Sequence, residues 1–305
     1  MKISHTLILA YSQLRPLPGL LNYMVSPVRR VLRFLIFKLL PYDYKKHTKV
    51  KSVVNDESLK VVVSLTSFPA RISNLWLVIN CLLHQTSQPD LIILWLSLKQ
   101  FEGLDDVPDS LKKLQSDKFQ IRFVDEDYRS HKKYLYVFNE YPNDYVILVD
   151  DDIIYRPDLL ENLIMYARLY PDSVICNYGS IIDYYDDGRL KPYNSWKKIK
   201  RLEPNYHHFF FGSGGGTLFR PCKLYKDVLN IKLALKLTPL ADDIWLNCMV
   251  RLSGLKIFYL NLGEFVPIKE EGYALFDENL SKNDIQLNAI IEYYQSEINI
   301  NPFNQ

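Results

Sequence analysis

From residue 60 onward, short apolar runs rich in β-branched residues alternate with stretches of helical periodicity. The predicted strands are 61–67, 91–97, 121–127, 145–152 and 173–180, and the predicted helices are 71–86 and 158–170. Strands separated by helical connections favour a mostly parallel sheet that is covered by helices on both faces. With 305 residues, of which 48% are hydrophobic, the chain can build a sizeable core around such a sheet. The sequence therefore predicts an α/β fold.

Polar side chains follow several of these runs at the point where each predicted strand ends. Thr66 and Ser67 close the first run, 125–127 is acidic at the end of the third, and three aspartates, 150–152, end the fourth. In such sheets, ligands bind in the crevice beyond the carboxyl ends of the strands. One acidic strand end is most often a turn or a helix cap, but several that face one crevice favour a binding site.

The stretch YVILVDDDII (145–154) places three like charges side by side. Two carboxylates about 4 Å apart repel each other by roughly 4 kcal/mol at an effective dielectric constant of about 20. Along an extended strand, Asp150 and Asp152 point to one side and Asp151 points to the other. Two carboxylates on one side suit a hard divalent cation such as Mg²⁺ or Mn²⁺, which takes oxygen ligands. We therefore predict a metal site at Asp150 and Asp152.

A second acidic pair, Asp242 and Asp243, precedes the helical pattern of 244–252. Aspartates commonly cap helices and are favourable in the first turn, which is one interpretation of the pair. The other is a general base above the crevice, which takes a proton from an attacking hydroxyl. The pair alone does not decide between them.

Two further segments could contact a ligand. The segment 209–221 contains four of the 11 glycines of the chain, which are Gly212, Gly214, Gly215 and Gly216. No Lys-Ser/Thr follows them, so the segment is not a P-loop, and we interpret it as close approach of backbone to a ligand. The segment 129–134 carries Arg129, Lys132 and Lys133. These side chains either neutralise phosphates or form a solvated, basic start of a helix.

The N-terminal segment differs from the rest of the chain, and we expect a division into 1–58 and a domain over 59–305. Within 28–40, apolar residues are interrupted by basic ones, namely Arg29, Arg30, Arg33 and Lys38. No charge-free run is long enough to span a bilayer. The segment is either a basic amphipathic helix on an anionic membrane surface or a helix packed on the domain with its arginines solvated.

Charge and cysteine content exclude some classes of partner and site. The net charge is +2 and no basic stripe stands out, so we expect no nucleic-acid partner. The four cysteines are far apart and have no metal-binding or redox spacing. Three of them lie in apolar or strand-like surroundings, which is typical of buried thiols in a reducing cytosol. We therefore expect a cytoplasmic protein. If the N-terminal segment binds a membrane, we expect that contact to be peripheral, on the inner face of the cytoplasmic membrane.

Taken together, the motifs resemble a known family. The chain is similar to bacterial family 2-like glycosyltransferases with the GT-A, Rossmann-like nucleotide-diphospho-sugar transferase fold, of the kind found in capsule, exopolysaccharide and lipopolysaccharide assembly. The matching segments are 61–72, 84–97, 121–134, 146–155, 212–219 and 241–245. The resemblance covers roughly residues 60 to 290. The aspartate-X-aspartate element is weak alone, whereas the ordered set of segments is specific.

The resemblance implies a metal-dependent enzyme that moves a sugar from a nucleotide-diphosphate sugar to a hydroxyl of a glycan or glycolipid. Asp150 and Asp152 would hold Mn²⁺ or Mg²⁺, and Asp243 would be the catalytic base with Asp242 beside it. The expected donor-binding residues are Thr66, Ser67, Arg71, Asp125, Lys132, Asp151, Gly214 and Gly215. A metal that neutralises the leaving diphosphate replaces a general acid, so one carboxylate base suffices for inversion.

Two other functions stay open at this point. A sugar nucleotidyltransferase can share the sheet and the acidic pair, but it should carry a glycine-rich basic loop after the first strand. Here that place reads LTSFPARI (65–72), without glycine. The third interpretation is a non-catalytic, metal-dependent carbohydrate-binding protein, which would tolerate the loss of Asp243. The chain also lacks the acidic turn that many relatives place after the second strand, since 95–101 reads WLSLKQF; the nucleotide base is therefore not predicted.

Overall fold

The central element of the computed structural model, which describes residues 2–15, 22–46, 59–198, 208–268 and 282–304, is a seven-stranded sheet. Its strand order is β11 (Lys256–Tyr259), β6 (Ser173–Cys176), β10 (Gly215–Phe219), β4 (Tyr145–Val149), β1 (Val61–Thr66), β2 (Leu91–Ser97) and β3 (Phe119–Val124). Strand β10 is antiparallel to β4 and β6, and the other pairs are parallel. The prediction of a mostly parallel sheet is confirmed.

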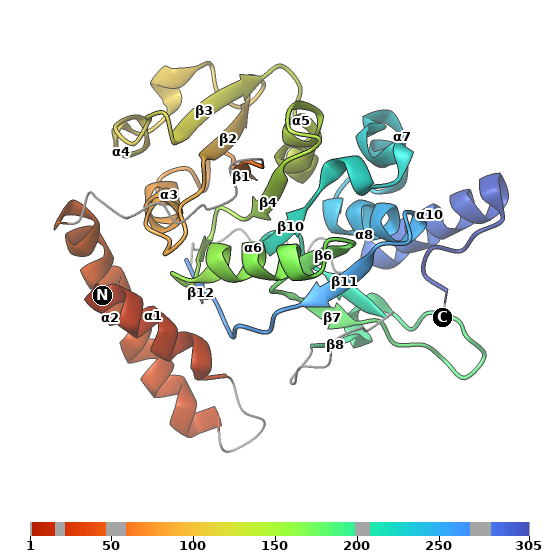
Figure 1. Cartoon of the computed structure of the whole chain (residues 1–305), viewed down its shortest axis with the longest axis horizontal. Helices are drawn as coiled ribbons and strands as arrows, with labels where there is room; N and C mark the ends of the chain where they lie inside the picture. Colours follow the sequence, from red (N-terminus) through yellow and green to blue (C-terminus); the bar gives the residue numbers. More distant parts are fainter. Residues whose placement is uncertain (1, 16–21, 47–58, 199–207, 269–281, 305) are drawn as a thin grey trace.

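Helices cover both faces of this sheet, as predicted (Figure 1). Along β1, Val61 and Val63 enter one hydrophobic cluster and Val62 enters the other, because successive side chains of a strand point to opposite faces. The first cluster packs against α1 (Ile3–Gln13), α2 (Asn22–Lys46), α3 (Leu75–Leu83), α4 (Asp109–Lys112) and α6 (Leu159–Leu169). The second packs against α5 (Lys132–Glu140), α7 (Ile231–Leu237), α8 (Asp242–Leu252) and α10 (Asn283–Ile298).

Smaller elements complete the fold. Strand β5 (Ile153–Ile154) pairs with β12 (Val266–Pro267), and β7 (Gly179–Ile181) lies between β8 (Lys197–Lys198) and β9 (Phe209–Phe211). Short 3-10 helices span Leu104–Asp106, Arg129–His131, Tyr193–Ser195, Pro221–Lys223 and Lys226–Leu229.

Four of the predicted strands end earlier than expected: β1 at Thr66, β3 at Val124, β4 at Val149 and β6 at Cys176. Strand β4 stops at Val149, so Asp151 and Asp152 lie in a turn. The run 173–180 is divided between β6 and β7, which belong to different sheets. It breaks at Asn177, whose backbone N–H donates to the Gly216 carbonyl at 3.1 Å and whose side chain accepts from the Leu262 N–H at 2.8 Å. Apolar periodicity alone does not reveal such side-chain bonds.

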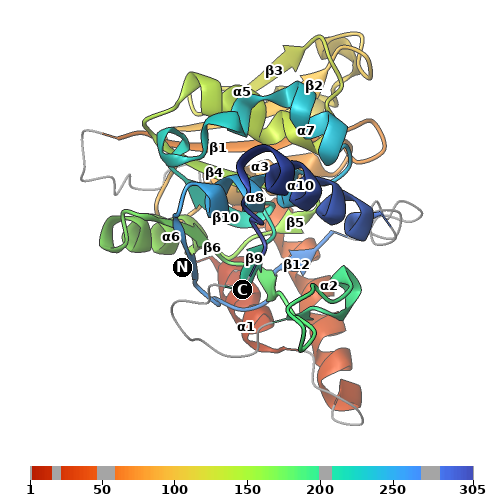
Figure 2. The same cartoon turned by 90° about the vertical axis from the view of Figure 1, so that its right-hand side faces the viewer.

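The two N-terminal helices lie side by side at one end of the molecule (Figures 1 and 2). Helix α2 is longer than the predicted segment 28–40 and contains both Pro27 and Pro41. Ile36 and Leu40 are fully buried in the first cluster, so α2 packs on the domain. None of the described helices is both long and apolar enough to cross a bilayer. The boundary at residue 58 stays a prediction, because 47–58 lie outside the described residues.

Candidate functional site

A buried lysine joins the two acidic motifs. Lys133, in the first turn of α5, has its Nζ 2.8 Å from Asp150 Oδ1 and 3.3 Å from Asp242 Oδ2. Asp150 directly follows β4, and Asp242 begins α8. The side chain of Lys133 is only 6% exposed. We call the group of Lys133, Asp150, Asp152, Asp242 and Asp243 the acidic centre.

The charges of this group stabilise one another. Burial disfavours the charge on Lys133, but Asp150 and Asp242 more than offset it and raise the pKa of Lys133 above its ordinary value. Burial alone would raise the pKa of Asp242, whereas Lys133 and His131 hold that pKa below its ordinary value. Lys133 and Asp242 are therefore a charged pair at neutral pH.

Asp243 is held by the segment that leads into β10. Its Oδ1 accepts a hydrogen bond from the Ser213 N–H at 2.7 Å, while Ser213 Oγ donates to Asp242 Oδ2 at 2.8 Å. Neither aspartate caps α8: the N-cap is Ala241, and within the described part of the chain no side chain caps this helix. Burial and the charge of Asp242 raise the pKa of Asp243 to about 7. Asp243 is thus a carboxyl group that loses its proton near neutral pH.

The turn after β4 is tied to the loop after β1. Asp151 is buried and accepts from Ser67 Oγ at 2.6 Å and from Arg71 Nη1 at 3.0 Å. The same Nη1 lies 2.9 Å from Asp152 Oδ2. The expected alternation of an extended strand is therefore wrong here, because Asp151 and Asp152 share Arg71 while Asp150 faces Lys133.

Asp150 and Asp152 remain accessible at this turn and fit a divalent cation. Their side chains are 40% and 33% exposed, and carboxylate oxygens are suitable ligands for Mg²⁺ or Mn²⁺. Burial and the charge of Asp150 raise the pKa of Asp152 to about 7, which reflects like charges held close together. No group of three or more His, Cys, Asp or Glu side chains that could hold a metal occurs among the described residues. A cation here would therefore need further oxygens from water or from a bound substrate.

Other predicted donor-binding residues lie apart from the acidic centre. Thr66 Oγ1 donates to the Trp95 carbonyl at 2.8 Å, at the end of β1. Lys132 pairs with Asp127, and Asp125 is exposed. Sequence reasoning selected Lys132, whereas the neighbouring Lys133 enters the acidic centre. Adjacent residues of a helix point about 100° apart, so the phase of α5 decides which lysine faces β4.

The glycines before and in β10 allow close packing at the acidic centre. A Cβ on Gly214 would lie 1.8 Å from Asp150 Cγ, and one on Gly215 would lie 2.2 Å from Tyr178 Cβ. The Asp150 N–H donates to the Gly214 carbonyl at 3.1 Å. The pairing of β10 with β4 shifts register around Gly216, whose φ of +92° suits glycine. Close packing within the chain therefore accounts for these glycines, and their contact with a donor stays a prediction.

A Gly214→Ala substitution should destabilise the protein by about 1 to 3 kcal/mol, the usual cost of an added methyl group without space. The new Cβ forces Asp150 away from Lys133, because the two side chains cannot occupy the same volume. Urea unfolding of both proteins measures this loss. An unchanged unfolding midpoint would show that Asp150 can move without cost and that this packing is unimportant.

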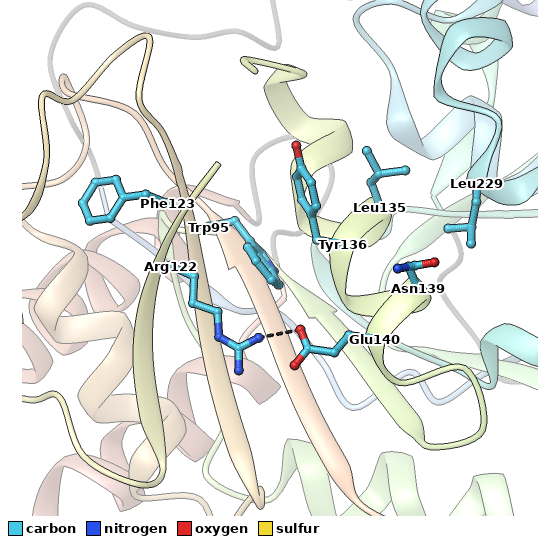
Figure 3. A pocket seen from close by; sticks show the side chains of 8 residues that line it. All are labelled: Trp95, Arg122, Phe123, Leu135, Tyr136, Asn139, Glu140 and Leu229. Carbon is cyan, nitrogen blue, oxygen red and sulfur yellow. Dashed lines mark hydrogen bonds and ion pairs between the residues drawn. The ribbon is translucent and has the colours of Figure 1, made fainter. Parts of the chain in front are cut away.

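A groove of about 740 Å³ lies between β2, β3 and α5 (Figure 3). It is lined by Trp95, Arg122, Phe123, Leu135, Tyr136, Asn139, Glu140 and Leu229. Arg122 crosses it to form an ion pair of 2.5 Å with Glu140. These lining residues lie outside the acidic centre. Trp95 nevertheless connects the groove to the acidic centre. Its Nε1 donates to Ser64 Oγ, and Ser64 Oγ donates to the Lys133 carbonyl.

Comparisons with known proteins give a family for the chain. The family described as "Glycosyl transferase family 2" matches residues 72–226, a range that contains Lys133, 150–152 and the glycines of β10 but not Asp243. No curated protein matches the chain.

Solved structures resemble the chain only distantly. HddC from Yersinia pseudotuberculosis is 15% identical, with 74% of this chain and 100% of that one covered at a TM-score of 0.41. A 4-diphosphocytidyl-2C-methyl-D-erythritol synthase is 10% identical, with 73% and 99% covered at a TM-score of 0.41. Likenesses this distant say nothing about the substrate of this chain. The family match over half of the sequence shows that the chain belongs to glycosyl transferase family 2.

Proposed function

We propose that this protein moves a sugar from a nucleotide-diphosphate sugar to a hydroxyl of a surface glycan or glycolipid, with inversion at the anomeric carbon. The observation that supports this proposal is the bridge made by Lys133. It connects Asp150, which follows β4, with Asp242, the neighbour of Asp243 in α8. The expected donor side and the expected base therefore meet at one acidic centre.

On the donor side, Asp150 and Asp152 are the proposed ligands of Mn²⁺ or Mg²⁺. When bound, such a cation neutralises the charge that develops on the leaving nucleoside diphosphate. Asp151 is a positioning residue in this proposal, because it is buried and ties the turn to Ser67 and Arg71. The Lys133 ammonium forms an ion pair with Asp150.

On the acceptor side, Asp243 is the proposed base. The Ser213 N–H orients one of its oxygens, and its pKa of about 7 lets it take a proton from a hydroxyl at neutral pH. Asp242 acts through its neighbour: its negative charge, maintained by Lys133, contributes to that raised pKa. One carboxylate base placed opposite the leaving group is sufficient for an inverting transfer.

The remaining proposed donor contacts lie beside this centre or near the ends of neighbouring strands. Arg71, Gly214 and Gly215 lie beside the turn after β4, and Thr66 and Ser67 end β1. We assign Asp125 and Lys132, which follow β3, to the nucleoside part of the donor. This assignment rests on their position at the carboxyl ends of neighbouring parallel strands.

Thermal unfolding in the presence of nucleotide sugars tests the proposal and identifies the donor. A ligand at 100 times its dissociation constant stabilises a protein by about 2.7 kcal/mol. We expect one nucleotide sugar to raise the melting temperature only when Mn²⁺ or Mg²⁺ is present. Stabilisation by a nucleoside triphosphate and a sugar phosphate, with release of pyrophosphate, would instead indicate a nucleotidyltransferase.

An Asp152→Asn variant should lose the metal-dependent part of donor affinity and all measurable transfer. Asp152 keeps its carboxylate partly exposed, and an amide is a poor ligand for a hard cation. Isothermal titration with the donor, with and without Mn²⁺, measures the change. Asp186→Asn, which removes an exposed carboxylate outside the acidic centre, is the matched control and should bind as the wild type does. Equal Mn²⁺ dependence in the Asp152 variant would contradict the metal assignment.

A further inference from the structure

Helix α2 exposes an apolar stripe on the side that faces away from the domain. The α2 stripe consists of Met24, Val28, Val31, Phe34, Lys38 and Tyr42. These residues follow one another at intervals of three or four, which places them on one face of a helix. Met24, Phe34 and Tyr42 are 75%, 63% and 78% exposed. Soluble proteins rarely leave contiguous apolar side chains of this size uncovered without a use for them.

The opposite face of α2 already has its partner within the chain. Ile36 and Leu40 are fully buried in the first hydrophobic cluster. Arg29 stacks over the Tyr11 ring and donates to its hydroxyl at 2.9 Å, and Arg33 Nε donates to the Pro267 carbonyl at 3.0 Å. Arg29 thus anchors α2 to α1, and Arg33 anchors it to the domain. Both arginines are half-buried, whereas the packed-helix interpretation of the sequence expected them to be solvated.

The two other basic residues of the predicted segment, Arg30 and Lys38, lie on the exposed side of α2 with the stripe. Arg30 and Lys38 are exposed, and the Lys38 ammonium lies over the Phe34 ring. Of the 37 Lys and Arg residues of the chain, six are among the first 42 residues, whereas none of the 35 Asp and Glu residues is. The first acidic residue of the chain, Asp43, directly follows Tyr42 and accepts a hydrogen bond from the Ser4 N–H at 2.8 Å. An exposed apolar stripe flanked by Arg30 and Lys38 is complementary to the interface of an anionic bilayer.

We infer that the α2 stripe binds the surface of an anionic phospholipid membrane, with its apolar side chains inserted at the level of the headgroups. Arg30 and Lys38 then contact lipid phosphates, and Arg33 connects the membrane-bound helix to the domain. A neutral protein partner would match the apolar side chains but not the one-sided charge of this segment.

Helix α2 is connected to the acidic centre through the face opposite the stripe. Arg33 bonds the carbonyl of Pro267 in β12, and the next residue, Ile268, donates its N–H to the Asp152 carbonyl at 2.7 Å. Strand β12 also pairs with β5, which follows the turn after β4. A membrane that binds α2 therefore lies on the side of the domain that carries β5 and β12. If the proposed transfer is correct, this position suits an acceptor that is itself carried by the membrane.

Vesicle sedimentation with the full-length protein tests the inference and needs no activity. We expect binding to vesicles of equal parts phosphatidylglycerol and phosphatidylcholine, little binding to phosphatidylcholine alone, and weaker binding in high salt. Replacing Met24, Val31 and Phe34 together by Ser should reduce the binding constant at least about tenfold. The matched control, Met165→Ser with Leu169→Ser on α6, alters side chains that are also exposed and should bind normally.

Other results would overturn the inference. These are no sedimentation of the wild type, equal binding to neutral vesicles, or an equal loss in the α6 control. A wild-type dimer that the stripe substitutions make monomeric, without vesicle binding, would assign the stripe to a second copy of the chain. Donor affinity in solution should be the same in all variants, so failure here is distinguishable from failure of the proposed transfer. Thermal unfolding confirms that each variant is folded.

Discussion

An Asp243→Asn variant is expected to transfer sugar about 10² to 10⁴ times more slowly than the wild type while it binds the donor almost unchanged. The base is needed only as the proton leaves the acceptor hydroxyl, so its loss affects the rate and not donor binding. Asn retains the oxygen that accepts the Ser213 N–H, and Asp243 does not cap α8, so the helix should remain intact. Isothermal titration with the donor and a transfer assay separate the two effects.

The pH dependence gives a second readout of the same residue. With a pKa of about 7, Asp243 is protonated below neutral pH and cannot accept a proton there. Because the pKa of Asp152 is also raised to about 7, the assay uses saturating Mn²⁺, which favours the ionised form of Asp152. Wild-type transfer should then rise with pH and level off above about 7, whereas the residual transfer of the Asn variant should lack this step. Asp227→Asn removes a carboxylate that accepts from the Tyr294 hydroxyl outside the acidic centre, and should keep the wild-type profile. A fully active Asp243→Asn variant would refute the base assignment.

Replacing Lys133 by Met should cost about 3 to 5 kcal/mol of unfolding free energy at neutral pH, the usual effect of removing one partner from a buried ion pair. The variant leaves Asp242 buried without its cation. In the wild type, Lys133 depresses the pKa of Asp242, a contribution that is present above the unfolded pKa of about 3.9 and lost as the pH falls through the folded value. The difference between the two proteins should therefore shrink below about pH 4.

Urea unfolding at neutral and acidic pH measures this effect. Lys99→Met is the matched control, because it removes a lysine whose partner, Glu126, is also exposed. Its stability should change little, since exposed ion pairs contribute little. A Lys133→Met variant as stable as this control would mean that Asp150 and Asp242 do not need the ammonium. It would also remove the observation on which the proposed function depends.

The sequence predicted the layout of the sheet and the two acidic motifs because both depend on local patterns. Apolar runs define β1, β2 and β4, and parallel pairing brings their carboxyl ends to one edge. It did not predict the inward direction of Asp151, which follows from the turn that begins after Val149. Strand alternation holds only as long as the backbone stays extended.

The sequence did not predict the role of Lys133, for a different reason. The 3-10 helix Arg129–His131 precedes α5 and sets the angular position at which the α-helix starts. A change of one residue in that start would direct Lys132 to β4 in place of Lys133. Asp242, the partner of Lys133 in α8, comes from a distant part of the chain. No local pattern therefore indicates that Lys133 will lie between Asp150 and Asp242.

The antiparallel direction of β10 has a consequence for biosynthesis. On the ribosome, β1 to β4 are complete before β10 is made. Until then, the edge of β4 that faces away from β1 stays unpaired. When β10 enters, it pairs Phe219 with Val146 and Thr217 with Cys176, which are long loop closures and therefore slow. A nascent chain arrested before Gly215 would expose this edge to other strands. We therefore expect the free edge of β4 to be an aggregation hazard during synthesis, which β10 removes when it pairs with β4.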